Sequence, residues 1–185
     1  MSKTALIIVD LQNDYFQGGK WELEGIEDAA KKAATLLESF RAKKLPVVHV
    51  RHEFPTSDAP FFVPGSDGAK VHSSLQETKT EPVIIKHQIN SFRDTNLKEI
   101  LDGLGVDSVL ICGAMSHMCI DAVTRAANDF GYNCAVAHDA CATLGLEFKG
   151  VTVPAVQVHA AFMAALGFAY ANVASTDELL SELKK

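Results

Sequence analysis

The sequence predicts an α/β protein in which helices cover both faces of an open parallel sheet. Three observations support this prediction. Short runs of branched apolar residues alternate with segments of helical periodicity along the chain, as in repeated strand–helix units. The first run, residues 5–9 (ALIIV), is apolar at every position, as in a strand buried on both faces. No two runs are joined by a hairpin turn signal.

The first half of the chain is expected to supply three strands and two helices. Residues 26–40 carry apolar side chains every three or four positions, with basic residues opposite, which predicts an amphipathic helix. Residues 46–50 (PVVHV) predict the second strand and residues 83–85 (VII) the third. Apolar residues at helical spacing in 97–104, followed by Gly105, predict a second helix and its end.

The second half repeats the alternation, beginning with the strand VLIC within residues 106–113. Residues 117–130 predict a helix that ends at Gly131. Helical periodicity places one stripe of its side chains inward: Cys119, Val123, Ala126 and Phe130.

Two more strands and two more helices complete the predicted fold. Residues 133–137 predict the fifth strand. Pro154 is expected to open a helix that Gly167 ends, and residues 168–173 follow as the sixth strand. Residues 175–178 (STDE) form a capping-box pattern in front of the last helix.

The connection between the second and third strands is unusually long. Residues 52–82 contain several prolines and glycines and three phenylalanines, but no clear helical pattern. Long connectors in compact domains often cover active sites. We therefore expect this segment to cover the site and to set its specificity.

Composition indicates a soluble globular protein of one domain, residues 1–185. Hydrophobic residues make up 48% of the chain and charged residues 22%, the balance of a protein with a full core. No apolar stretch is long enough to cross a membrane, and the N-terminal run is too short for a signal peptide. The net charge of −6 without a basic tract argues against nucleic acid and anionic membranes as partners.

The four cysteines are expected to be free thiols in the cytoplasm. None belongs to a CxxC pair, and nothing indicates secretion. They are Cys112, Cys119, Cys134 and Cys141.

Three chemically distinct side chains are expected at one edge of the sheet. Ligands of open parallel sheets bind at the carboxyl ends of the strands, where Asp10 and Lys86 end the first and third strands. After the fourth strand, Ser116 is expected to cap the next helix. Cys119 then lies in the first turn, where the helix dipole can lower a thiol pKa. An inert core cysteine, a turn-forming Asp10 and a solvated Lys86 remain the alternative.

Five segments together resemble the isochorismatase-like cysteine hydrolase superfamily, which includes nicotinamidases, ureidoacrylate and carbamoyl-sarcosine amidohydrolases, and isochorismatases. They are ALIIVDLQNDYF, PVVHVRHEF, KHQINSFRDTNL, VLICGAMSHMCIDAVTRAA and HDACAT. The resemblance covers nearly the whole chain. It implies a three-layer fold with a six-stranded parallel sheet, ordered 3-2-1-4-5-6 by strand number.

The resemblance also implies a mechanism. The family triad falls on Asp10, Lys86 and Cys119, and the family's cis peptide falls on the bond between Ala114 and Met115. The sulfur would attack an amide or imide-like carbonyl, with the N–H groups of Met115 and Cys119 holding the oxyanion and Asp10 moving the proton.

Two departures from the family pattern narrow the expected activity. Nicotinamidases carry an Asp-x-His metal pair after the second strand, where this chain has His52 and Phe54. Isochorismatases that cleave a vinyl ether lack the cysteine. We therefore expect a cofactor-free amidohydrolase acting on a small amide, ureido or imide compound. A metal-assisted nicotinamidase, an isochorismatase-type hydrolase and a non-catalytic, oxidisable thiol protein remain alternatives.

A metal site would need His49 and His52 to converge, but their positions on one strand point them in different directions, so we expect none. The sequence also contains no dinucleotide or nucleotide-triphosphate motif.

Aromatic and polar residues near the strand ends are further candidates for substrate binding. Six aromatic residues could line a pocket: Phe16, Trp21, Phe54, Phe61, Phe62 and Phe92. Family analogy favours Phe16 and Trp21. Further candidates are His52, Ser116 and His117, with Asp139 and Thr143 shaping the rim. The apolar C-terminal segment and the resemblance also suggest a homo-oligomer, either a dimer or a tetramer.

Overall fold

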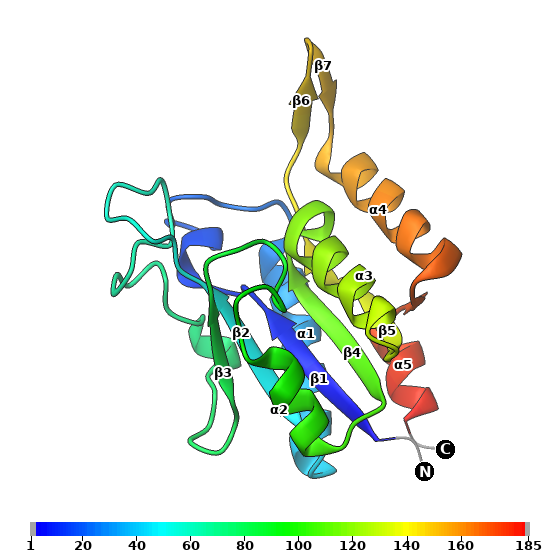
Figure 1. Ribbon diagram of the computed structural model, residues 1–185. Coiled ribbons are helices and arrows are strands. Elements are labelled where there is room, and N and C mark those ends of the chain that lie inside the picture. Colours follow the sequence, from blue (N-terminus) through cyan, green and yellow to red (C-terminus); the bar gives the residue numbers. More distant parts are fainter. Residues whose placement is uncertain (1–2, 184–185) are drawn as a thin grey trace.

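A six-stranded parallel sheet organises the protein (Figure 1). The computed structural model describes residues 3–183. The strand order is β3-β2-β1-β4-β5-β8, and every neighbouring pair is parallel. The predicted order is confirmed, with β8 as the sixth strand. The bounds are β1 Thr4–Val9, β2 Val47–His52, β3 Val83–Lys86, β4 Ser108–Ala114, β5 Asn133–Ala142 and β8 Asn172–Ala174.

Helices cover both faces of the sheet, which confirms the predicted three layers (Figure 1). On one face lie α1 (Ile26–Ala42) and α5 (Thr176–Glu182). On the other lie α2 (Leu97–Leu104), α3 (Asp121–Asp129) and α4 (Ala155–Ala169). Each face has its own apolar core because successive strand residues point to opposite sides.

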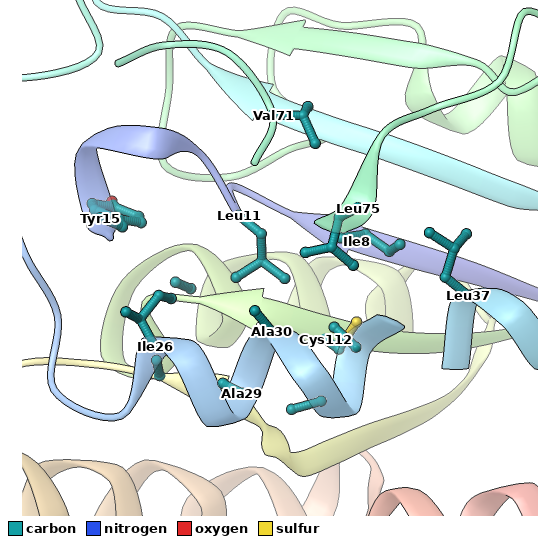
Figure 2. Packing of buried hydrophobic residues seen from close by; sticks show 14 of the residues in the cluster. Ile8, Leu11, Tyr15, Ile26, Ala29, Ala30, Leu37, Val71, Leu75 and Cys112 are labelled. Atoms are coloured by element: carbon teal, nitrogen blue, oxygen red, sulfur yellow. The ribbon is translucent and has the colours of Figure 1, made fainter. Parts of the chain in front are cut away.

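Helix α1 packs as its periodicity predicts. All of its predicted apolar positions are buried: Ile26, Ala29, Ala30, Ala33, Leu36, Leu37 and Phe40. Figure 2 shows Ala30 close to Cys112, and Leu75 of the long connector close to Ile8. Residues of α1 and of the connector therefore belong to one apolar core. Burial of each large apolar side chain in it contributes about 1.5–3 kcal/mol to stability.

The prediction that the chain contains no hairpin is wrong. Strands β6 (Leu146–Phe148) and β7 (Val151–Val153) pair antiparallel and project from the body of the molecule (Figure 1). Their turn residues, Lys149 and Gly150, both have positive φ, 52° and 82°. Two-residue turns of this kind usually begin with Asn, Asp or Gly. Because Lys149 occupies that position, the sequence pattern did not indicate a hairpin.

The helix expected over 117–130 is two elements. A five-residue π-helix, η3 (Ser116–Ile120), precedes α3. A π turn holds more residues than an α turn, so the inward stripe shifts along the sequence. Cys119 and Val123 are buried as predicted, but Ala127 rather than Ala126 continues the buried stripe, and Phe130 is 49% exposed.

The remaining boundaries differ modestly from the predicted ones. Helix α4 continues through Gly167, so the sixth strand begins at Asn172 rather than at residue 168. An added Cβ at Gly167 would make only ordinary van der Waals contact with the Val173 side chain. The predicted capping box is present: Glu178 accepts from the Ser175 N–H, and the Ser175 hydroxyl accepts from the Glu178 N–H.

Two short 3-10 helices flank the sheet edge, η1 (Asn13–Tyr15) and η2 (Ser73–Leu75). Within residues 3–183, no helix has the length and apolar character required to span a membrane.

Gly113 should be essential for the pairing of β1 with β4. Its φ is +129°, and an added Cβ would collide with the Val9 carbonyl oxygen, which is backbone and cannot move aside. We expect Gly113→Ala to lower the free energy of unfolding by about 3 kcal/mol or more, measured by urea denaturation.

Gly131→Ala is the matched control. Gly131 also has a positive φ, +92°, but open space surrounds it, so only the backbone cost of about 1–2 kcal/mol applies. Equal losses in the two variants would contradict the proposed collision.

Candidate active site

Asp10, Lys86 and Cys119 come together at the carboxyl edge of the sheet. Asp10 follows β1, Lys86 ends β3, and Cys119 lies in the π-helix after β4. The Lys86 Nζ lies 2.8 Å from Asp10 Oδ2 and 3.2 Å from Cys119 Sγ. Asp10 and Lys86 are fully buried and Cys119 is 3% exposed. A carboxylate, an ammonium and a thiol thus share one nearly closed space.

His52, at the end of β2, is the third group in contact with Lys86. Its Nδ1 lies 3.1 Å from the Lys86 Nζ. An ammonium can only donate, so the ring nitrogen is the acceptor. Burial lowers the pKa of His52 to about 4, and the Lys86 charge acts in the same direction. The ring is therefore neutral at pH 7.

Gln12 holds the backbone of His52, a role that sequence analysis missed. Its Oε1 accepts from the His52 N–H at 2.7 Å, and its Nε2 donates to the His52 carbonyl at 2.8 Å. Nε2 also donates to the Ala69 carbonyl in the long connector, at 2.8 Å. The side chain is fully buried. Gln12 thus ties the ends of β1 and β2 to the covering segment.

The predicted lowering of the Cys119 pKa is wrong. Burial and then the negative charge of Asp10 raise the pKa of this thiol to about 12, although Lys86 opposes the change. Burial also disfavours the Lys86 ammonium, but Asp10 and Cys119 outweigh that effect and raise the pKa of Lys86. At neutral pH the sulfur is therefore a thiol beside a charged Asp10–Lys86 pair.

Ser116 does not cap the helix. Its hydroxyl is fully buried, 2.8 Å from His159 Nδ1 and 3.3 Å from the Ala142 carbonyl oxygen. The N-cap position of the π-helix belongs to Met115, without a side-chain cap. Ser116 instead joins the start of η3 to α4 and β5.

The backbone before Cys119 has an irregular form. The peptide bond between Ala114 and Met115 is cis. The Met115 carbonyl accepts hydrogen bonds from the N–H groups of Met118 and Ile120, at 3.0 and 3.2 Å. Among the backbone hydrogen bonds of residues 3–183 outside regular elements, none has the Met115 N–H as donor.

Most of the predicted aromatic residues form one chain of rings that begins at His52. Phe54 lies 4.5 Å from the His52 ring and 5.2 Å from Phe61, and Trp21 stacks on Phe61 at 4.8 Å. Trp21 is 39% exposed, so the chain leads from the surface to the Lys86 environment. Tyr15 belongs to the same cluster, 4.5 Å from Phe62. Burial, and then Asp10 and Cys119, raise the pKa of the Tyr15 hydroxyl, a link to the site that sequence analysis did not anticipate.

Two of the predicted aromatic residues lie elsewhere. Phe16 stacks on His72 of the connector at 3.7 Å and lines a cavity of about 740 Å³. That cavity is not lined by Asp10, Lys86 or Cys119. Phe92 packs against Phe130 at 5.1 Å, in contact with the core of the α2–α3 face, so its predicted place in the pocket is wrong.

The two predicted rim residues also separate. Thr143 contacts half-buried His117, whose Nδ1 lies 2.6 Å from the Thr143 hydroxyl. Asp139 instead accepts from the N–H and hydroxyl of Thr176, at 2.7 and 2.8 Å, and so holds the start of α5.

The residues present do not form the metal site of nicotinamidases. His49 turns to Glu81 at 3.1 Å, whereas His52 turns to Lys86. Phe54 has no ligand atom. Within residues 3–183, no three His, Cys, Asp or Glu side chains are grouped as metal ligands.

Known proteins of similar sequence and structure share this architecture. The family model described as the isochorismatase domain matches residues 4–176. YddQ of Bacillus subtilis, an uncharacterized isochorismatase family protein, is 48% identical over 177 residues, 96% of this chain and 98% of its own.

Solved structures agree. A protein of Oleispira antarctica assigned as an isochorismatase hydrolase has a TM-score of 0.95 and 64% identity, and the match covers 97% of each chain. The N-carbamoylsarcosine amidase of Thermoplasma acidophilum has a TM-score of 0.80 and 25% identity, covering 95% of this chain and 97% of its own. On its sequence and its fold, this chain belongs to the isochorismatase family of hydrolases.

Proposed function

We propose that this protein is a cysteine-dependent amidohydrolase that cleaves a C–N bond of a small amide, ureido or imide compound through a thioester. The observation that carries the proposal is the contact of one buried ammonium, Lys86, with both a carboxylate and a thiol, within 3.2 Å. The name of the related N-carbamoylsarcosine amidase supports C–N hydrolysis as the reaction class.

The reaction begins with a neutral thiol. As Cys119 Sγ attacks the substrate carbonyl, its proton passes to Asp10, whose Oδ1 has no hydrogen-bond partner among the described residues. Lys86, 3.2 Å from the sulfur, stabilises the negative charge that develops there. The C–N bond breaks and Asp10 returns the proton to the departing amine.

Hydrolysis of the thioester reuses the same groups. Asp10 takes a proton from water as the water oxygen attacks the acyl carbon, and the C–S bond breaks. The sulfur regains a proton and the carboxylic acid leaves. The backbone N–H groups of Met115 and Cys119 are our candidates for holding the oxyanion in both steps.

The pocket that selects the substrate is expected around the same groups. We propose His52, Phe54 and Trp21 as its aromatic wall, because their rings lead from the surface toward Lys86. His117 at the N-terminal turn of η3 adds a polar edge. Phe16 and Ser116 contact other parts of the protein, the connector and α4, and we expect them to act on the pocket's shape.

The geometry favours this activity over the alternatives. A metal-assisted nicotinamidase would need ligands that Phe54 cannot supply. Cleavage of a vinyl ether gives no role to a thiol beside an ion pair. A thiol kept only for oxidation would be expected in an exposed position with a low pKa, whereas Cys119 is buried with a raised pKa.

We also propose a cytoplasmic homo-oligomer without resident cofactor. All four cysteines are free, which suits a reducing compartment. Helix α4 is apolar on its outer side, where Val156 is 71% and Phe168 92% exposed. Apolar surface of this kind marks contact sites, so we place the interface between copies on α4.

Replacing the thiol should abolish hydrolysis. We expect Cys119→Ser to lower kcat/KM by about 10³-fold or more, because a serine hydroxyl is a far weaker nucleophile in this site. The measurement is ammonia release from a panel of small amides, ureido acids and cyclic imides. Cys134→Ser is the matched control: Cys134 is also buried, but its sulfur donates to the carbonyls of Thr124 and Tyr132, within the core of the α2–α3 face. Full activity in Cys119→Ser would refute the proposal.

The rate of Cys119 alkylation should depend on pH as expected for a thiol of high pKa. With the pKa near 12, the thiolate fraction rises about tenfold per pH unit up to that value. We expect the rate of modification by iodoacetamide, measured at Cys119 by peptide mass spectrometry, to climb without a plateau from about pH 7 to 9.5. A plateau near pH 8 would instead indicate an activated resting thiolate.

A charge on α4 should break the oligomer. We expect the wild-type protein to sediment as a dimer or tetramer and Phe168→Asp to shift toward monomer, because burying an unpaired carboxylate is unfavourable. Phe130→Asp, at an exposed aromatic residue at the end of α3, is the control. An unchanged sedimentation coefficient for Phe168→Asp would exclude α4 as the interface.

A further inference from the structure

The Lys86 ammonium has three protons and three neighbouring acceptors. Asp10 Oδ2 lies at 2.8 Å, Cys119 Sγ at 3.2 Å and His52 Nδ1 at 3.1 Å. Lys86 is fully buried, and a buried charged donor without an acceptor is strongly destabilising. Two of the acceptors belong to the proposed triad. The third, His52, has been placed in the wall of the pocket but has no role in the chemical steps described so far.

The chemistry of the contact fixes the state of the His52 ring. Lysine has no lone pair to offer, so Nδ1 must be unprotonated and Nε2 must carry the proton. The ring is buried, and burial together with the Lys86 charge keeps it neutral at pH 7. It therefore contributes a lone pair to the site and no charge.

The position of the ring is itself controlled. On one side, β2 pairs with β3, and His52 is in register with Lys86. On the other side β1 has already ended, and the Gln12 amide takes its place by pairing with both the N–H and the carbonyl of His52. The backbone beneath the ring is thus held on both sides, which aims Nδ1 at the ammonium.

We propose that His52 is a positioning residue, whose neutral ring accepts one proton of Lys86 and thereby directs another toward the sulfur of Cys119. Without that acceptor the ammonium would be free to rotate or withdraw, and the sulfur would lose the group that stabilises its negative charge. The proposal rests on the proposed function only in taking Cys119 as the nucleophile.

The test compares three substitutions on one strand by the rate of Cys119 alkylation. In His52→Leu, which removes the lone pair, we expect the rate at pH 8 to fall about tenfold, equivalent to one pKa unit of lost thiolate. In His52→Asn, whose Oδ1 can take the place of Nδ1, we expect it to stay within about threefold of wild type. In His49→Leu we expect no change, because His49 is equally buried but turns to Glu81.

Turnover gives a second readout that a merely structural role would not reproduce. On any substrate found for the wild type, His52→Leu should lower kcat by a larger factor than it raises KM, because the ring both borders the pocket and holds Lys86, and His52→Asn should restore most of kcat. Alkylation of His52→Leu at the wild-type rate, with the fold intact by circular dichroism, would overturn the proposal.

If His52→Leu fails to fold, the ¹⁵N chemical shifts of the His52 ring in the wild-type protein test the proposal instead. They should show His52 with a proton on Nε2 and none on Nδ1, and the opposite tautomer would overturn the proposal. Neither the shifts nor the alkylation rates need a substrate. Failure of the amidohydrolase proposal, seen as hydrolysis by Cys119→Ser, is therefore distinguishable from failure of this one.

Discussion

The site depends on a single buried ammonium. Lys86 has no access to water, so protein groups must satisfy both its charge and its protons. The Asp10 carboxylate balances the charge at 2.8 Å, and the sulfur and the His52 ring accept at 3.2 and 3.1 Å. Removing any one of these partners leaves the buried Lys86 with an unbalanced charge or an unpaired N–H group, which is unfavourable. The constraint explains why a carboxylate, an imidazole and a thiol converge on one point.

The sheet brings these partners together without requiring any of them to be close in sequence. Parallel strands all deliver their carboxyl ends to the same edge. Asp10, His52 and Lys86 come from the ends of three adjacent strands, β1, β2 and β3. Cys119 arrives through the π-helix after β4. Gln12 then joins the first two strand ends to the covering segment at Ala69, so the cover and the site share one set of hydrogen bonds.

The same burial that fixes Lys86 sets the resting chemistry of the sulfur. In water a neighbouring ammonium would favour the thiolate, but here burial and Asp10 outweigh it and raise the pKa of Cys119 to about 12. In the proposed reaction, this neutral thiol becomes a nucleophile only as it attacks a substrate carbonyl. Asp10 Oδ1, which has no hydrogen-bond partner among the described residues, is our candidate acceptor for its proton.

The sequence by itself determined the layers, because apolar periodicity depends only on neighbouring residues, and it placed Asp10, Lys86 and Cys119 at or just after predicted strand ends. The strand order came from the resemblance to the isochorismatase-like family, since local periodicity does not fix which strands pair. Tertiary structure alone decided the pairing of His52 with Lys86 and the hold of Gln12 on His52, since both join residues more than thirty positions apart. It also decided the thiol pKa, Ser116's contact with His159 and the shifted stripe of α3. Burial and a π turn act through surroundings that a linear pattern does not record.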